Sequence, residues 1–159
     1  DIINIIVSCA TLVGGVLIII GAAMGLTSYM VDAQIPMKIL SVMKELVNSK
    51  YVFLILLNIF LLIIGCLMDI FSAIIIVVPL IAPLGLHYGV DPIHLAIIFI
   101  ANLELGYLTP PVGMNLFLSA YRFDKKMPEI YKSTFPFFIV LLVAVLFITY
   151  FPQLTLWLL

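Results

Sequence analysis

Residues 90–121 read VDPIHLAIIFIANLELGYLTPPVGMNLFLSAY, and this stretch decides the fold. It is apolar on both sides of a Gly-Tyr-Leu-Thr-Pro-Pro-Val-Gly segment and is long enough to cross a hydrocarbon core about 30 Å thick. Pro110 and Pro111 lack the backbone N–H that a helix needs, and their rings clash with the carbonyls of Gly106 and Tyr107. The sequence therefore predicts one transmembrane helix that is discontinuous near its middle.

The break releases polar backbone groups inside the membrane. The Gly106 and Tyr107 carbonyls lose their donors, and a small cation is one candidate partner for them. Thr109 as N-cap and Pro110 as the first helical residue predict a new helix, whose positive N-terminal end suits a carboxylate. Such breaks form the midplane sites of secondary transporters; a purely structural kink is the alternative interpretation.

Two polar side chains precede the break. Glu104 lies about halfway along an apolar span, where an ionisable residue is costly and faces a pathway or a partner. No opposite charge lies at helical spacing from it, so its partner is a proton or a group outside this segment. Asn102 is about one turn from the break, so its oxygen is a candidate ion ligand, with a helix–helix hydrogen bond as the alternative.

The composition is that of an integral membrane protein. Of 159 residues, 65% are hydrophobic and only 9% are charged, and the mean hydropathy is +1.36. A soluble domain of about 150 residues buries only about 70% of its chain surface, so lipid must be the solvent for most of this chain. A net charge of −1 without a basic cluster argues against nucleic acid. No nucleophile–base pair points to an enzyme.

The alternation of apolar and polar runs predicts the remaining segments. Residues 1–31 form a transmembrane helix with small residues suited to close packing. Residues 32–50 form an amphipathic helix that is too polar to span and lies at the interface. Residues 122–132 are the most charged stretch and form a loop, and residues 133–159 form the C-terminal transmembrane helix.

Residues 51–89 contain two apolar runs separated by a two-residue break that includes Asp69. Both runs are at the short limit for spanning, so they form either two short spans with Asp69 in water or a re-entrant helical hairpin. In the re-entrant arrangement, Asp69 caps the second arm near Ser72, and the carbonyls around Gly65 and Cys66 face the same space. Composition alone does not choose between them.

Loop charge predicts the orientation. The 122–132 loop carries four Lys and Arg residues, against three in the longer 32–50 segment on the opposite side. The positive-inside rule therefore places 122–132 in the cytoplasm and the C-terminus in the periplasm.

The stretch from Asn102 to Phe117 resembles the large permease subunit of the tripartite ATP-independent periplasmic (TRAP) transporters. GCLMD at 65–69, PLIAP at 79–83 and GVDPIH at 89–94 carry the same resemblance, which covers essentially the whole chain. It implies the C-terminal portion of a DctM-like subunit, one half of an inverted-repeat elevator-type transporter of the bacterial inner membrane. In those terms, 1–31 is a scaffold helix, 32–50 an arm helix and 51–89 a re-entrant hairpin.

The resemblance also implies a function. The permease imports an organic anion of the carboxylate or dicarboxylate class, coupled to sodium and without another cofactor. A periplasmic solute-binding protein, a small membrane subunit and the N-terminal half of the same permease are the expected partners. Sodium is expected between the hairpin tip and the break, at Gly65, Cys66, Asp69, Asn102, Gly106, Thr109, Pro110 and Gly113. The solute is expected at Ser72, Thr109 and Pro111.

Many members of this family have an uncharged residue where this chain has Glu104, so the resemblance leaves its role open. Two other functions fit the same residues: a dicarboxylate/sodium symporter of a related fold that needs no binding protein, and a membrane scaffold that transports nothing. Uptake without sodium separates the scaffold from the transporters, and uptake without the binding protein separates the two transporters.

Overall fold

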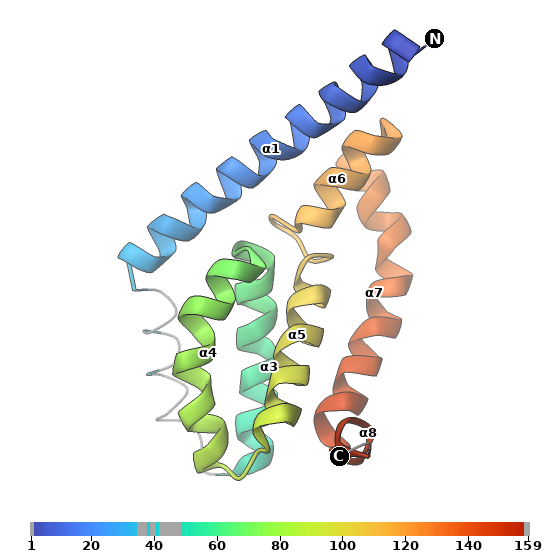
Figure 1. Cartoon of the computed structure of the whole chain (residues 1–159). Helices are drawn as coiled ribbons and strands as arrows, with labels where there is room; N and C mark the ends of the chain where they lie inside the picture. Colours follow the sequence, from blue (N-terminus) through green and yellow to red (C-terminus); the bar gives the residue numbers. More distant parts are fainter. Residues whose placement is uncertain (1, 35–37, 39–40, 42–48, 158–159) are drawn as a thin grey trace.

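The computed structural model describes residues 2–34, 38, 41 and 49–157, and in these ranges the chain forms helices and turns without a strand (Figure 1). Four described helices are long and apolar enough to cross a membrane: α1 (Ile2–Asp32), α3 (Lys50–Leu67), α4 (Ile70–His87) and α7 (Met127–Tyr150). Three shorter helices are α5 (Pro92–Gly106), α6 (Met114–Phe123) and α8 (Gln153–Leu156). This is the architecture of an all-α, multi-pass membrane protein.

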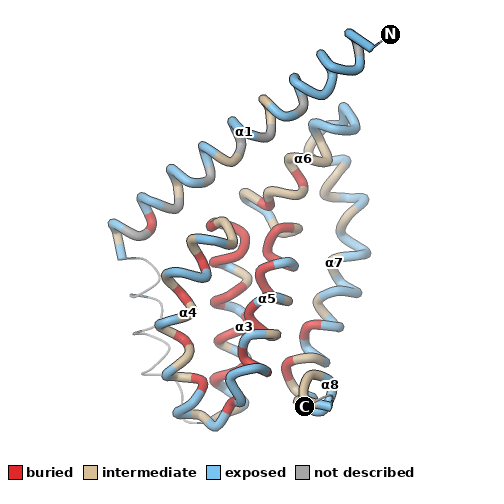
Figure 2. Tube along the Cα trace, in the orientation of Figure 1, coloured by how far each residue is buried: buried red, intermediate tan, exposed pale blue. Residues whose placement is uncertain are grey.

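The core of the molecule is centred on α3. Half of the α3 span is buried, whereas Met30 is the buried residue among those of α1 whose burial is described, and Figure 2 shows the buried residues concentrated on α3 and α5. The two helices run parallel, because Lys50 Nζ donates to the Gly89 carbonyl at one end (2.8 Å) and Gly65 contacts Gly106 at the other. The α3–α5 interface is the most extensive contact between two helices.

Local sequence explains how α3, α4 and α5 begin. The Asp69 carboxylate caps α4 by accepting from the backbone N–H groups of Phe71 and Ser72. Asp91 caps α5 in the same way, with Pro92 in the first turn, which confirms the predicted helix start. Since only residues 68–69 separate α3 from α4, the two helices form a tight hairpin.

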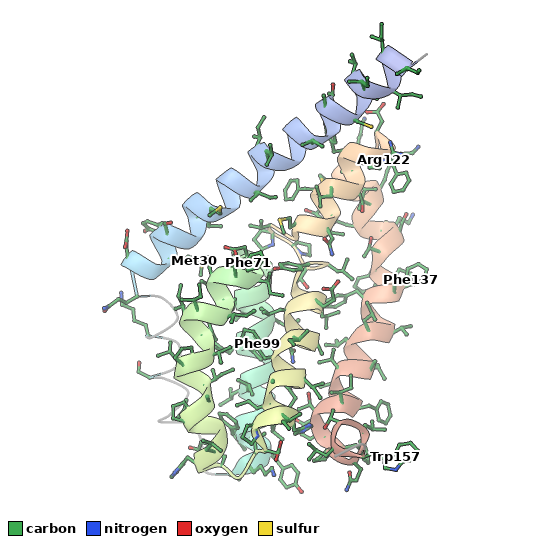
Figure 3. The ribbon with its side chains drawn as sticks, in the orientation of Figure 1. Met30, Phe71, Phe99, Arg122, Phe137 and Trp157 are labelled. Atoms are coloured by element: carbon green, nitrogen blue, oxygen red, sulfur yellow. The ribbon has the colours of Figure 1, made fainter. Side chains whose placement is uncertain are left out.

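The outer surface is strongly apolar. On α1, Ile18 is 75% exposed, and beyond α7, Trp157 is 87% exposed. Figure 3 shows Phe137 and Trp157 pointing away from the other helices. Apolar surface of this extent is stable against lipid or against further protein, not against water.

The charged stretch at 122–132, expected as a loop, is mostly helical. α6 continues to Phe123 and α7 already begins at Met127, so only residues 124–126 connect them. Pro128 in the first turn and Glu129 beside it both favour a helix start, and the density of charge hid this signal. The helix expected over 133–159 likewise ends at Tyr150, with the single turn of α8 after Pro152.

The amphipathic arm helix predicted over 32–50 falls almost entirely outside the described residues. The structure describes α1 up to Asp32 and α3 from Lys50 onward, with Ser49 as its N-cap. The arm helix therefore stays a prediction.

Candidate functional site

The tip of the α3–α4 hairpin lies beside the break between α5 and α6 (Figure 1). A cavity of about 10 Å³, which we call the tip cavity, separates them. It is lined by residues of the hairpin turn and of the break: Gly65, Cys66, Leu67, Met68, Asp69, Tyr107, Val112 and Met114. This volume is about the room that one water-sized species needs.

Two glycines bring the hairpin and the broken helix together. A Cβ on Gly106 would lie 2.6 Å from the Cα of Gly65, and a Cβ on Gly65 would lie 3.0 Å from the Cα of Leu103. The helix backbones are therefore in direct contact, which only residues without a side chain allow. Both glycines were predicted as sodium-binding; the structure gives them a packing role beside the tip cavity.

Asp69 is held at the tip by its own helix. One carboxylate oxygen accepts from the N–H groups of Phe71 (3.0 Å) and Ser72 (3.1 Å), and the other accepts from the Ser72 hydroxyl (2.6 Å). Ser72, predicted as a solute ligand, therefore donates its hydroxyl proton to Asp69. Asp69 still lines the tip cavity.

The carbonyl end of α3 also faces this region. The last helical bond runs from the Met68 N–H to the Ile64 carbonyl (2.8 Å). The carbonyls of Gly65, Cys66 and Leu67 follow it, and no other described residue donates to them. These oxygens carry the negative end of the helix dipole, so they can bind a small cation.

At the break, the predicted release of two carbonyls is half correct. The Gly106 carbonyl accepts from the Thr109 N–H (2.9 Å), so it is not free. Among the described residues, the Tyr107 carbonyl has no donor, because the residue four positions on is Pro111. The Thr109 hydroxyl donates to the Leu105 carbonyl (3.0 Å).

The helix after the break does not begin at Thr109 and Pro110, as the sequence predicted. It begins at Met114 with Gly113 as N-cap. Thr109 and Pro110 each precede a proline, which disfavours helical backbone angles, so a helix can start only after Pro111. Gly113 has φ 37°, in the left-handed region, where glycine costs least.

The N-terminal end of α6 faces the tip cavity, since Met114 lines it. No side chain caps this end. Its unpaired N–H groups and positive dipole suit an anion, as predicted for the helix after the break but four residues later in the chain. The tip cavity is thus lined by the last residues of α3 and by the first residue of α6.

Thr109 and Pro110 lie in a different cavity, of about 230 Å³, between the break and α7. We call it the α7 cavity; it is lined by Leu108, Thr109, Pro110, Tyr131, Thr134, Phe135 and Phe138. Its walls are mainly apolar, with hydroxyl groups from Thr109, Tyr131 and Thr134. Of the predicted sodium ligands, three line the tip cavity (Gly65, Cys66 and Asp69), two line the α7 cavity (Thr109 and Pro110), and three line neither (Asn102, Gly106 and Gly113).

Asn102 lies fully buried between α5 and α3, away from both cavities. Its amide nitrogen donates to Asn58 Oδ1 (2.7 Å) and to the Ile98 carbonyl (2.8 Å). Its Oδ1 has no hydrogen-bond partner among the described residues. The helix–helix hydrogen bond that the sequence left as an alternative is therefore present. The sequence analysis did not single out Asn58, which lies within an otherwise apolar run. A polar residue in such a run could have indicated a hydrogen bond between helices.

Glu104 and Pro111 are exposed on the surface of the described chain. Glu104 faces away from the α3 interface and forms no ion pair with a described residue. Tyr107, by contrast, was not singled out from the sequence. Its ring lines the tip cavity, and its buried hydroxyl lies near the Ile70 backbone without an ordinary hydrogen bond to any described residue.

His94 is buried at the start of α5. Its ring nitrogens contact the Thr155 hydroxyl (2.7 Å) and the Thr149 carbonyl (3.2 Å). It therefore ties the start of α5 to the corner between α7 and α8. The apolar residues around it gave no local signal of this long-range contact.

Comparison with known proteins identifies the family. Residues 1–154 match the family described as the tripartite ATP-independent periplasmic transporter, DctM component. The chain belongs to the DctM family. A relative from Pseudomonas aeruginosa, named as the C4-dicarboxylate TRAP transporter large permease protein DctM, is 38% identical over 138 residues, which are 87% of this chain and 32% of the relative.

Other DctM relatives carry different names. An uncharacterized protein, YgiK, from Salmonella typhimurium is 38% identical over 89% of this chain and 32% of its own length. The isethionate TRAP transporter permease protein DctMQ from Oleidesulfovibrio alaskensis is 35% identical over 86% of this chain and 22% of its own. The chain thus spans about a third or less of the length of these DctM relatives. No solved structure matches it.

Proposed function

We propose that this DctM chain supplies part of a sodium and organic-anion pathway in a permease of the bacterial inner membrane. The carrying observation is the tip cavity, which is lined by Asp69 and by the last residues of α3, whose carbonyls have no donor among the described residues. Secondary transporters use the C-terminal ends of helices and unwound backbone carbonyls to coordinate a coupling sodium ion. The membership of the family supports the same function.

The different sizes of the tip cavity and the α7 cavity support a different ligand for each. The tip cavity, about 10 Å³, admits one water-sized ion and no organic solute. We assign sodium to it, with oxygens from Gly65, Cys66 and Asp69 as the ligands. The α7 cavity, about 230 Å³, has room for a small organic anion and presents Thr109 at the break. We assign the solute to that side.

The position of the hairpin supports the re-entrant alternative. Figure 1 places the tip level with the break, while α6 and the first part of α7 extend beyond it. Each arm has 18 residues, about 27 Å of helix, against 24 residues in α7. A hairpin that stops inside the membrane brings its carbonyl ends to the ion, as an elevator-type transport unit requires.

The partners follow from the family. A periplasmic solute-binding protein delivers the anion, a small membrane subunit supports the permease, and the rest of the permease completes the pathway. Two relatives are named for C4-dicarboxylate and isethionate, so the solute class of this chain is an organic anion that the binding protein selects. In this topology the 124–126 connection lies in the cytoplasm and the C-terminus in the periplasm.

Uptake by the complete complex in proteoliposomes tests the proposal. We expect accumulation of a C4-dicarboxylate or isethionate probe with an inward sodium gradient, and none with a potassium gradient or without the binding protein. Equal uptake in potassium would overturn sodium coupling. Uptake without the binding protein would favour the symporter, and no uptake of any probe the binding protein binds would favour the scaffold.

A matched pair of variants tests the assignment of the α7 cavity. The hydroxyls of Thr109 and Thr11 each donate to the carbonyl four residues earlier, at 3.0 and 2.8 Å. Thr109→Val should raise the half-saturating concentration of the solute-loaded binding protein, and Thr11→Val, on exposed α1, should not. If both variants behave like the wild type, the solute does not use Thr109.

A further inference from the structure

Three buried polar side chains meet where α3, α5 and α7 pack together. Asn58 Oδ1 accepts from Asn102 Nδ2 (2.7 Å) and from the Thr149 hydroxyl (3.1 Å). The exposed fraction is 5% for Asn58 and 0% for the other two. We call these three residues the polar anchor.

Each member of the anchor is also fixed to its own helix. Asn58 Nδ2 donates to the Leu54 carbonyl (2.7 Å), Asn102 Nδ2 donates to the Ile98 carbonyl, and the Thr149 hydroxyl shares its proton with the Val145 carbonyl (2.8 Å). If either side-chain amide were rotated by 180°, its oxygen would face a backbone carbonyl oxygen, and the hydrogen bond to that carbonyl would be lost. The network therefore has one orientation. Side chains held at both ends define the relative position of three helices.

The anchor is the main polar contact inside the described bundle. Among the described residues, the buried polar side-chain groups are those of the anchor, His94 and the Tyr107 hydroxyl; His94 contacts the Thr149 carbonyl, and the Tyr107 hydroxyl has no described hydrogen-bond partner. The rest of the α3–α5 interface is apolar, and apolar contacts in lipid specify the register of two helices only weakly. The hydrogen bond between Asn58 and Asn102 therefore adds a directional contact that, together with the Gly65–Gly106 packing, fixes the register of α5 on α3.

That register determines the tip cavity. Along the parallel helices, Asn58 is two turns before Gly65, about 10 Å, and Asn102 is about one turn before Gly106. A slip of α5 along α3 would break the amide pair and separate Gly65 from Gly106 together. The tip carbonyls and the break would then no longer bound one cavity.

The anchor does not have the composition that stability alone would select. Asn102 Oδ1 is buried without a described partner, and an unsatisfied buried acceptor is destabilising. Apolar residues of similar size would avoid that cost, so these positions favour a unique arrangement over maximal stability.

We propose that Asn58, Asn102 and Thr149 are positioning residues, which hold the broken helix in register on the hairpin so that the tip cavity has the dimensions of the ion. The inference rests on the proposed function, because it concerns the same cavity, but it assigns residues that do not touch the ion. Asn58 and Thr149 act only through the α5 backbone.

The test uses the complete permease complex in proteoliposomes. Thr149→Val removes the hydroxyl and keeps the shape, and Thr149→Ser keeps the hydroxyl, so the two form a matched pair. We expect Thr149→Val and Asn58→Leu to raise the half-saturating sodium concentration about three- to tenfold, the range for losing one membrane hydrogen bond. Thr149→Ser should restore the wild-type value. Wild-type sodium affinity in both Thr149→Val and Asn58→Leu would overturn the inference.

A cross-linking measurement keeps the test independent of transport. Cys66 and Met114 both line the tip cavity, so Met114→Cys, with Cys9 and any other cysteine of the complete permease replaced by Ser, provides a cross-link between the tip and α6. Thr149→Val should slow its formation, and Thr149→Ser should not. An unchanged rate would contradict the positioning role, even if uptake proved independent of sodium and the proposed function failed.

Discussion

Gly106→Ala tests the contact on which the candidate site depends. The added Cβ would lie 2.6 Å from the carbonyl carbon and the Cα of Gly65, and 3.0 Å from the Cys66 nitrogen. These are backbone atoms, which do not turn aside as a flexible side chain does. Restoring an ordinary contact of at least 3.4 Å requires α3 and α5 to separate by about 0.8 Å.

An opening of that size exceeds the tolerance of a binding site, which is about 0.5 Å. Overpacking of this kind also costs about 1–3 kcal/mol of stability. We therefore expect Gly106→Ala to raise the half-saturating sodium concentration by about tenfold or more and to lower the thermal midpoint of the purified complex. Sodium-dependent uptake and a thermal unfolding assay measure the two effects.

Alanine substitutions at two other glycines serve as comparisons for Gly106→Ala. Gly65→Ala should have a weaker effect, because its Cβ would lie 3.0 Å from Leu103 Cα and 3.2 Å from Gly106 Cα. Gly21→Ala, on α1 with nothing within 4 Å, should leave transport unchanged and stabilise the helix by up to about 1 kcal/mol. Wild-type sodium affinity and stability in Gly106→Ala would refute the close contact.

Three further substitutions probe the tip, the break and the C-terminal corner. Gly113→Ala adds a Cβ 2.8 Å from the Thr109 carbonyl oxygen, at a residue whose φ is 37°. We expect uptake to fall at least tenfold with normal membrane insertion. Undiminished uptake would contradict the described turn. Asp69→Ala removes the α4 cap and should cost about 1 kcal/mol of stability in a thermal unfolding assay. Asp69→Asn can still cap the helix and should keep most of that stability. Equal losses in the two variants would mean that capping is not the cause. His94→Leu loses the contacts to Thr149 and Thr155, so limited proteolysis should cut near α8 faster than in the wild type; an unchanged cleavage rate would argue against that tie.

Local chemistry in the sequence was sufficient for several features. Asp91–Pro92 predicted the start of α5, because an N-cap and a first-turn proline act within one turn. The proline pair predicted that no helix passes through residues 107–113, for the equally local reason that two donors are missing. Where these local rules compete, as at Thr109 and Pro110, the restriction before a proline outweighs the capping preference.

Contacts between distant residues were beyond such rules. Gly65 and Gly106 were expected at a sodium site from the family resemblance, and only the packing of α3 on α5 shows that their backbones touch. Asn58, Asn102 and Thr149 lie in three separate apolar runs, and nothing in any run indicates the other two. The same limit applies to Thr109, whose place in the α7 cavity depends on where α7 packs.

The most direct test of the central claim is a high-resolution structure of the complete permease complex in sodium, compared with one in potassium. We predict density for a single ion in the tip cavity, at the carbonyls of Gly65 and Cys66 and the Asp69 carboxylate, present only in sodium. Sodium-dependent transport with that cavity filled by a side chain, or with the ion elsewhere, would contradict it.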